Sequence, residues 1–398
     1  MTYLDRRSPP HLSTLVLVSG MAALSLNIFL PSLPGMARHF GVDYALMQLS
    51  VSAYLAVSAG FQFVIGPVSD RFGRRPVLIS MLALFVAATI GTLLASNAHV
   101  FLAFRLLQAC VTTAFVLSRA AVRDMVPGPQ AASMIGYVTM GMSLVPMIGP
   151  VIGGIFDQWF GWQANFLMLL VCGLAVLALV WADMGETATG SGLGFADQLR
   201  AYPTLLRSQR FWGYCLSAAF ASGLFFAYLG GAPFVGTRVF GLSSAQVGLY
   251  FALPAVGYGL GNFLSGRFAA HLGMDRMVLI GTSVSTSALV AALLAELTGA
   301  SHPLIFFGAV GVTGLGNGLS LPSATAGLMS VRPELAGTAS GLGATLMIGG
   351  GAALSALSGA LLHPGSGALP LILVMLASSA ASVAAILWVR ARQARLGL

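Results

Sequence analysis

Long apolar runs separated by short polar turns fill almost the whole chain. The runs fall at roughly 12–33, 46–66, 76–96, 99–122, 131–156, 162–182, 211–233, 244–270, 276–297, 303–330, 335–361 and 369–390. At about 1.5 Å per residue, each run is long enough to cross a bilayer core about 30 Å thick. A helix satisfies its own backbone hydrogen bonds in lipid, so the pattern predicts an all-α membrane protein with twelve transmembrane helices.

The arginines divide unevenly between the two sides of this predicted topology. Those in or near the terminal segments and the turns on the same side are Arg6, Arg7, Arg71, Arg74, Arg75, Arg119, Arg123, Arg200, Arg207, Arg210, Arg267, Arg276, Arg332, Arg390, Arg392 and Arg395. Only Arg38 and Arg238 fall in the opposite turns, and Arg105 lies within a run. Because arginine-rich segments stay in the cytoplasm, both termini are predicted to be cytoplasmic. The net charge of +8 then follows from topology, and we expect no nucleic-acid partner.

Composition excludes a large soluble core. Charged residues are 8% of the 398 residues and hydrophobic residues are 57%, whereas about 25% of a typical soluble domain is charged. The three cysteines lie inside apolar runs, and the chain has neither a metal-binding spacing nor a membrane-embedded pair of acids or histidines. The sequence therefore predicts no enzymatic activity, no metal and no cofactor.

The longest polar segment, 183–210, divides the chain into six runs and six runs. Its glycine-, serine- and threonine-rich part and the basic part after it predict a flexible cytoplasmic linker followed by a membrane-surface stretch. We therefore expect an N-terminal six-helix bundle at 1–182 and a C-terminal six-helix bundle at 211–398. The segment Asn262–Phe268 echoes Gly66–Phe72 at an offset of 196 residues, which favours two pseudo-symmetric bundles.

A charged turn at 66–78 follows the second run. With the two six-helix halves and the central linker, it resembles the motif between spans two and three of the major facilitator superfamily, where this turn is a gate. The residues of the predicted gate are Gly66, Asp70, Arg71, Gly73, Arg74, Arg75 and Asp124. The resemblance implies that Asp70 contacts the start of the eleventh-span helix near Leu335, where a helix dipole favours an acid, and that the arginines pair with Asp124. The alternative is a basic turn that only fixes topology.

The fifth run carries a second motif that resembles the antiporter signature of the superfamily's twelve-span exporters. Its residues are Gly141, Gly149, Pro150, Gly153 and Gly154. Small residues let helices approach closely, and a proline loosens the helix locally. Close packing is the immediate physical interpretation, and exporter-type behaviour is what the resemblance implies.

Further matches narrow the resemblance to the Bcr/CflA group of drug exporters. They are Asn27–Pro34, Arg105–Ala109, Arg123 with Asp124, Ala232–Val235 and Phe240–Ser243. The resemblance implies a multidrug-type efflux transporter that moves small, largely apolar, phenicol-like compounds across the bacterial inner membrane by alternating access. We expect a monomer whose partners are the small-molecule substrate and the lipid bilayer.

The fourth run has a polar stripe at helical spacing that includes Arg105, Gln108 and Thr112. An arginine inside a span usually faces a cavity and carries function, although Arg105 could instead extend to the near membrane surface. Polar and methionine residues of other spans complete a mostly apolar cavity of the kind that binds small molecules. The cavity candidates are Asn27, Phe29, Tyr54, Gln62, Arg105, Gln108, Thr112, Tyr137, Met140, Tyr228 and Asn317.

Asn27 departs from the Bcr/CflA pattern, which has aspartate at this position. An amide cannot carry a proton, and none of the eleven acids falls near the middle of a span. The resemblance implies coupling to a proton gradient, which would then use a peripheral acid. The alternative is a proton-independent carrier or exchanger of a small organic anion, with Arg105 as the counter-charge. A membrane receptor or scaffold that transports nothing is the remote alternative.

Overall fold

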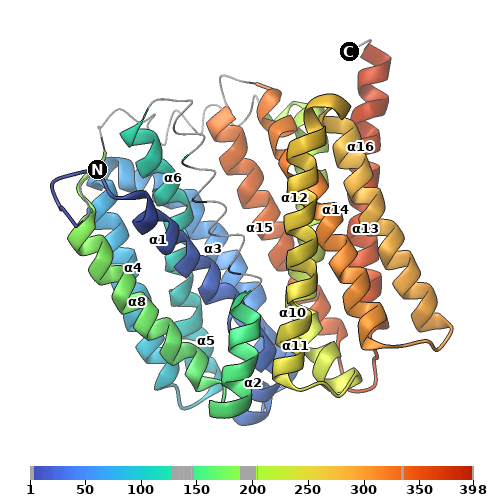
Figure 1. The fold of residues 1–398 in the computed structure, drawn as a ribbon, viewed down its shortest axis with the longest axis horizontal. Helices are drawn as coiled ribbons and strands as arrows, with labels where there is room; N and C mark the ends of the chain where they lie inside the picture. The colour runs from blue at the N-terminus through green and yellow to red at the C-terminus, as the bar shows by residue number, and fades with distance from the viewer. Residues whose placement is uncertain are drawn as a thin grey trace. The chain divides into compact units, whose positions relative to one another are not determined.

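The structure is a computed structural model and describes residues 4–126, 134, 138, 145, 148–188, 203, 205–332 and 336–396. Within these residues the chain is helical and has no strand (Figure 1). Eleven segments of the described chain are long and apolar enough to cross a membrane, and most of their ends lie within a few residues of the predicted runs. The predicted fifth run, 131–156, lies largely outside the described residues. Residues 148–160, which include its described end, are helical.

The chain divides into two compact units, Met1–Phe195 and Ala196–Leu398. The first unit contains the helices α1 (Leu12–Asn27), η1 (Leu30–Ser32), α2 (Leu33–Phe40), α3 (Tyr44–Phe72), α4 (Arg74–Leu93), α5 (Ala98–Leu107), η2 (Gln108–Thr112), α6 (Thr113–Met125) and α8 (Gln163–Asp183). Those of the second unit are α10 (Gln209–Phe234), η3 (Val235–Val239), α11 (Ser244–Tyr250), α12 (Ala252–Leu272), α13 (Met274–Leu297), α14 (Pro303–Ser330), α15 (Ala336–Leu361) and α16 (Leu369–Leu396). Helices distant in sequence run side by side, such as α4 and α8 in the first unit (Figure 1).

The first span is interrupted near its predicted end. α1 stops at Asn27, the 3-10 turn η1 follows at Leu30–Ser32, and α2 continues to Phe40. Pro31 and Pro34 have no backbone N–H, so they cannot complete the hydrogen-bond ladder of a continuous helix. The last turn of α1 therefore ends inside the bundle, where its polar groups can meet side chains from other spans.

The fourth span is interrupted as well. The 3-10 segment η2 joins α5 to α6, and the hydroxyls of Thr112 and Thr113 donate to the carbonyls of Ala109 and Cys110, each at 2.7 Å. Such local side-chain bonds compete with the regular helix ladder. Arg105 lies in the last turn of α5, directly before this interruption.

The two units repeat one another at an offset of 200 residues. Gly41 and Gly241 both have left-handed backbone conformations, with φ of 65° and 66°, and Gly73 and Gly273 have φ of 96° and 80°. Gly73 lies between α3 and α4, and Gly273 lies between α12 and α13. The offset of 196 expected from the sequence echo is therefore wrong by one helical turn, because arginine, phenylalanine and serine recur by chance near the true register.

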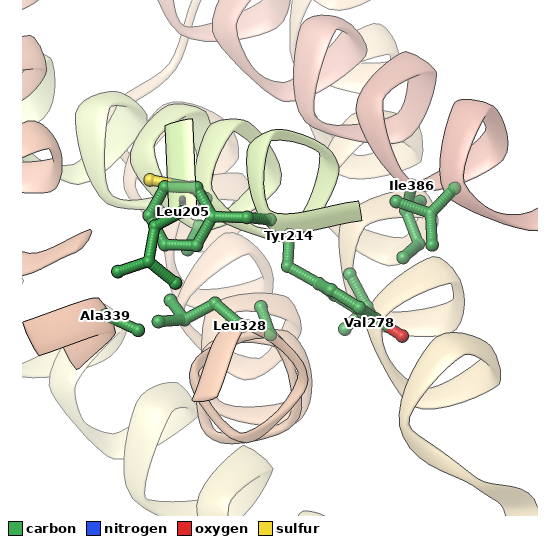
Figure 2. Packing of buried hydrophobic residues seen from close by; sticks show 11 residues of the cluster. Leu205, Tyr214, Val278, Leu328, Ala339 and Ile386 are labelled. Atoms are coloured by element: carbon green, nitrogen blue, oxygen red, sulfur yellow. The ribbon is translucent and has the colours of Figure 1, made fainter. Parts of the chain in front are cut away.

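The second unit is held together by small side chains and by hydrogen bonds between helices. Its buried cluster draws residues from α10, α13, α14, α15 and α16, including Tyr214, Val278 and Leu328 (Figure 2). The Ser382 hydroxyl donates to the Ser217 carbonyl at 2.8 Å, which links α16 to α10. In lipid such contacts stabilise helix packing because apolar surface gains nothing by leaving one apolar solvent for another.

Candidate functional site

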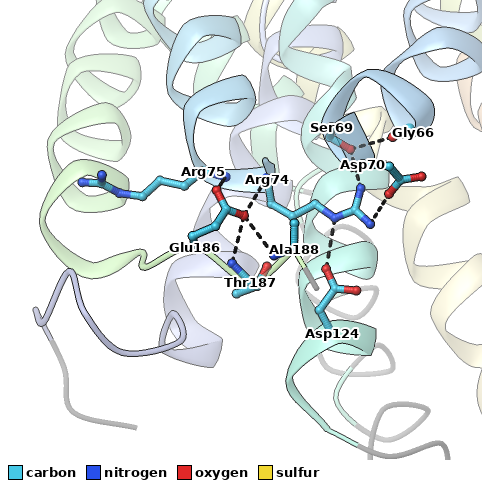
Figure 3. A network of polar contacts seen from close by, with 9 residues as sticks. All are labelled: Gly66, Ser69, Asp70, Arg74, Arg75, Asp124, Glu186, Thr187 and Ala188. Atoms are coloured by element: carbon cyan, nitrogen blue, oxygen red, sulfur yellow. Dashed lines mark hydrogen bonds and ion pairs between the residues drawn. The ribbon is translucent and has the colours of Figure 1, made fainter. Parts of the chain in front are cut away.

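The charged turn between α3 and α4 is organised around Arg74. Its guanidinium forms an ion pair with Asp70, binds Asp124 through Nε at 3.0 Å and donates to the Ser69 hydroxyl at 2.5 Å (Figure 3). Arg74 is only 6% exposed, so both carboxylates neutralise a largely buried charge. The side chain thus ties the end of α3 to the end of α6.

Glu186, which follows α8, completes this turn and was not among the predicted site residues. Its carboxylate accepts hydrogen bonds from the backbone N–H groups of Arg74 at 2.8 Å and Arg75 at 3.3 Å (Figure 3). It therefore caps the N-terminus of α4, where orphan N–H groups and the helix dipole favour an anion. A Cβ at position 73 would overlap the Glu186 carboxylate, so this close approach requires glycine in addition to the positive φ. The acid directly after a span is the one sequence signal that could have indicated the cap.

The other residues of the predicted gate have separate environments. Arg75 donates to the Trp181 carbonyl at 3.1 Å, and Arg71 lies over the ring of Phe72 at 5.4 Å. Of the three arginines, Arg74 is the one that forms an ion pair with Asp124 among the described residues. Gly66 accepts a hydrogen bond from the Ser69 hydroxyl at 2.8 Å. The expected contact between Asp70 and the eleventh span joins the two units, and Leu335 lies outside the described residues, so this contact stays a prediction.

Arg105 is the centre of a second, fully buried cluster. Its Nη2 donates to the Ser25 carbonyl at 2.7 Å, its Nη1 to the Gln108 side chain at 2.8 Å and to the Ser25 hydroxyl at 3.2 Å, and its Nε to the Ser50 carbonyl at 3.3 Å. The guanidinium carbon also lies 4.0 Å from the Tyr54 ring centre and 4.4 Å from that of Phe29. With an exposed fraction of 0%, the side chain does not extend to the membrane surface. α1, α3 and the fourth span meet at this one cation.

The Arg105 cluster contains neutral partners throughout. The Tyr54 hydroxyl donates to the Ser25 hydroxyl at 3.2 Å, and the Gln108 amide donates to the Thr89 hydroxyl on α4 at 2.7 Å. Arg105 forms no ion pair with a carboxylate among the described residues. Aromatic faces and carbonyl oxygens stabilise a buried guanidinium but do not cancel its charge.

Asn27 lies at the end of α1 with one unused polar atom. Its amide nitrogen donates to the Ala23 carbonyl at 2.7 Å, which fixes the orientation of the amide because a carbonyl can only accept. The side-chain oxygen of Asn27 is buried and has no hydrogen-bond partner among the described residues. Of the predicted cavity residues, Asn27, Phe29, Tyr54, Arg105 and Gln108 thus gather around the end of α1 and the Arg105 cluster.

Two glycines of the fifth-span motif pack directly on the interruption of the first span. A Cβ on Gly149 would lie 3.7 Å from the Asn27 Cβ, which is an ordinary contact. A Cβ on Gly153 would overlap the carbonyl oxygen of Ile28. Pro150 and Gly154 are buried on the same helix, and Gly141 lies outside the described residues. Gly153 is therefore the position at which close approach requires glycine.

Asn165 on α8 holds the first and fifth spans together through hydrogen bonds, and it was not among the predicted site residues. It is fully buried, and its amide nitrogen donates to the Ser32 hydroxyl at 2.9 Å and to the Gly153 carbonyl at 3.1 Å. One side chain therefore joins the first, fifth and sixth spans. A single asparagine near the start of a span carries no periodic signal, so the sequence alone gave no reason to select it.

The remaining cavity candidates do not join the Arg105 cluster. Gln62 is half-buried on α3, and the Thr112 hydroxyl is bound to its own helix. In the second unit, the amide nitrogen of Asn317 donates to the Ala221 carbonyl at 3.0 Å, and the fully buried Tyr228 packs 4.9 Å from Phe251 with no partner for its hydroxyl among the described residues. Tyr137 and Met140 lie outside the described residues.

A groove of about 960 Å³ runs between α13 and α14, and none of the predicted cavity residues lines it. Within the described part of the chain, no three His, Cys, Asp or Glu side chains are grouped as metal ligands would be. The Arg105 cluster offers hydrogen bonding and a buried positive charge in an aromatic setting.

Comparison with known proteins identifies the family. The sequence model of the family described as "Major Facilitator Superfamily" matches residues 15–356. The chain is 30% identical over 320 residues to "Chloramphenicol resistance protein" of Pseudomonas aeruginosa, covering 80% of this chain and 76% of that protein. It is 29% identical over 374 residues to "Multidrug resistance protein D" of Escherichia coli (strain K12), covering 93% and 94%.

The fold agrees with a solved transporter structure. "Crystal structure of D-xylose-proton symporter" superposes with a TM-score of 0.75 over 95% of this chain and 96% of that one, at 16% sequence identity. This likeness confirms the expected all-α, twelve-span architecture, and the two relatives agree with the predicted resemblance to drug exporters of the Bcr/CflA group. The chain belongs to the major facilitator superfamily, a family of membrane transporters and not of enzymes.

Proposed function

We propose that this protein exports small, largely apolar compounds of the phenicol type out of the cell. The observation that carries the proposal is the 30% identity to a chloramphenicol resistance protein along most of both chains. The buried cluster around Arg105 supports it, because aromatic faces with a few hydrogen-bonding groups suit a small neutral molecule better than a highly polar one.

Export proceeds by alternating access of two six-helix bundles, at 1–182 and 211–398, that the linker 183–210 connects. The turn around Arg74 is the gate of the N-terminal bundle, and the tie from Asp70 through Arg74 to Asp124 supports this role because it links three span ends through one side chain. The protein works as a monomer in the bacterial inner membrane with both termini in the cytoplasm, as the arginine distribution favours. It has no nucleic-acid partner.

The experiment is export of radiolabelled chloramphenicol from cells that lack their own exporters. Expression of the wild type should lower steady-state accumulation, and an equally expressed Asp70→Asn variant should lower it less. Equal accumulation with and without the protein, at confirmed membrane insertion, would reject export of this class of compound.

A second candidate is a proton-independent carrier of a small organic anion. The observation that favours it is Arg105, a buried cation whose hydrogen-bond partners among the described residues are all neutral. Proteoliposomes with an imposed pH gradient separate the two candidates. Gradient-driven chloramphenicol movement supports the exporter with coupling through a peripheral acid, whereas gradient-independent exchange of an aromatic carboxylate supports the carrier.

A further inference from the structure

The acids described in the N-terminal unit lie outside the helices or near their ends, and most of them bind a neighbouring group. Asp70 and Asp124 bind Arg74, Asp183 accepts the Leu4 and His11 N–H groups at 2.7 and 2.9 Å, and Glu186 caps α4. The undescribed part of the fifth span adds no acid, because residues 127–147 contain neither aspartate nor glutamate. The membrane interior of this unit therefore holds no negative charge.

The same interior holds positive charge on the fourth span. Arg105 is fully buried, and carbonyls, a hydroxyl, an amide and two aromatic rings surround it. Arg119 lies on α6, beyond the 3-10 interruption of the same span. The Nε atom of Arg119 is buried without a hydrogen-bond partner, and this residue forms no ion pair with the described part of the chain.

From this uncompensated charge we infer that the protein discriminates against cations, so that its substrates are neutral or anionic. The inference rests on the proposed export function and names the charge class of its substrates. A cation placed about 8 Å from an arginine is disfavoured about thirtyfold at an effective dielectric constant of about 20. A neutral compound of the same shape pays no such penalty. Asn27 is central here because an aspartate at this position would supply the missing negative charge two residues from Ser25, which binds Arg105.

The test compares three probes built on one scaffold in proteoliposomes. They are neutral chloramphenicol, anionic chloramphenicol hemisuccinate, and the deacylated amine of chloramphenicol made permanently cationic by quaternisation. The wild type should transport the neutral probe, and the cation should inhibit that transport at least about tenfold more weakly than a neutral analogue of equal size. Equal inhibition by the cation and the neutral analogue would overturn the inference.

Two matched variants locate the effect. Asn27→Asp adds an acid beside the Arg105 cluster and should let the cation inhibit within a few-fold of the neutral analogue. Asn262→Asp adds the same acid at an asparagine of the second unit whose amide also donates to a carbonyl of its own helix, and it should leave the cation excluded. Admission of the cation by both variants, or by neither when both insert and transport chloramphenicol, would overturn the inference. If either variant fails to insert, the wild-type inhibition series alone decides.

The outcomes separate this inference from the proposed function. Absence of transport for every probe rejects export itself. Transport of the neutral and cationic probes at equal rates leaves export standing and rejects only the discrimination by charge.

Discussion

Buried polar side chains in the N-terminal unit bind mainly the carbonyls and hydroxyls of neighbouring spans. Arg105, Asn165 and Gln108 each reach a second helix in this way, at distances between 2.7 and 3.3 Å. In lipid these contacts are worth about 0.6 kcal/mol on average and up to about 1.7 kcal/mol each, so several together fix one arrangement of the spans without an ion pair. Such a cluster keeps a polar site rigid while leaving its net charge unchanged.

Asn165 gives the most direct test of this residue-scale view. Asn165→Ala removes the hydrogen bonds to Ser32 and Gly153, and we expect it to destabilise the protein by about 1–2 kcal/mol. Thermal unfolding in detergent, followed by size-exclusion chromatography, measures the change. Asn262→Ala is the matched control, because the Asn262 amide donates to the Tyr258 carbonyl of its own helix. Equal losses for the two variants would show that the link between spans adds nothing.

The residues around Arg105 show what could be predicted from the sequence at this scale. An arginine inside an apolar run is conspicuous, so Arg105 and its neighbour Gln108 could be selected as site residues. Ser25 and Ser50 could not be selected, because Arg105 binds their backbone carbonyls, which every residue possesses. Asn165 and Glu186 were missed for a similar reason, since Ser32 lies 133 residues from Asn165 and Arg74 lies 112 residues from Glu186.

At the scale of helices, the interruptions of the first and fourth spans place the Arg105 cluster. The spans themselves follow from hydrophobicity because a run of about twenty apolar residues has few alternatives to a membrane helix. Pro31 is a sequence signal for the first interruption, whereas the 3-10 segment Gln108–Thr112 has no proline or glycine that would indicate it. Helix position could therefore be predicted in this chain more fully than helix continuity.

The packing of the fifth span on the first predicts a sharp difference between two glycines. Gly153→Ala would place a methyl group on the Ile28 carbonyl, so we expect a loss of about 1–3 kcal/mol in stability and reduced export. At Gly149 the nearest atom to an added methyl is a Leu24 side-chain carbon at 3.4 Å, so Gly149→Ala should be tolerated. Parallel measurements of unfolding temperature and chloramphenicol accumulation check both. Indistinguishable variants would contradict the assignment of Gly153 as the point of close approach.

The Glu186 cap on α4 leads us to expect that a change at Glu186 lowers the transport rate without unfolding the protein. Glu186→Gln keeps the size of the side chain but removes the charge that faces the Arg74 and Arg75 N–H groups. We expect the maximal transport rate to fall several-fold with little change in KM, because the cap orients Arg74 and does not touch substrate. Glu296→Gln is the control, since Glu296 binds the exposed Ser301 hydroxyl at 2.7 Å. A change in KM alone would place Glu186 in substrate binding.

At the scale of the molecule, the repeat at 200 residues shows that the two units share a plan but differ in charge. The turn after α3 carries the Asp70, Arg74 and Arg75 charges, whereas the turn after α12 has Ala270, Met274 and Asp275 at the same positions. Asp275 binds the Tyr214 hydroxyl on α10 within its own unit. Among the described residues, the ion pairs of this tie lie in the N-terminal unit, which is the asymmetry expected if this turn regulates a transport cycle.

Asp70→Asn tests that regulation in the whole protein. The amide keeps the shape of Asp70 but weakens its bond to Arg74, while Asp124 still neutralises the arginine, so the variant should insert and unfold at nearly the wild-type temperature. If the turn is a gate, its transport rate should nevertheless fall several-fold, because the balance between the conformations of the cycle depends on this carboxylate. Proteoliposome uptake of chloramphenicol measures the rate, and Asp43→Asn at the opposite end of α3 is the control, since Asp43 has no part in the turn. Wild-type transport by the Asp70 variant would reduce the turn to a topological signal, and a matching fall in the Asp43 variant would assign the effect to α3 as a whole.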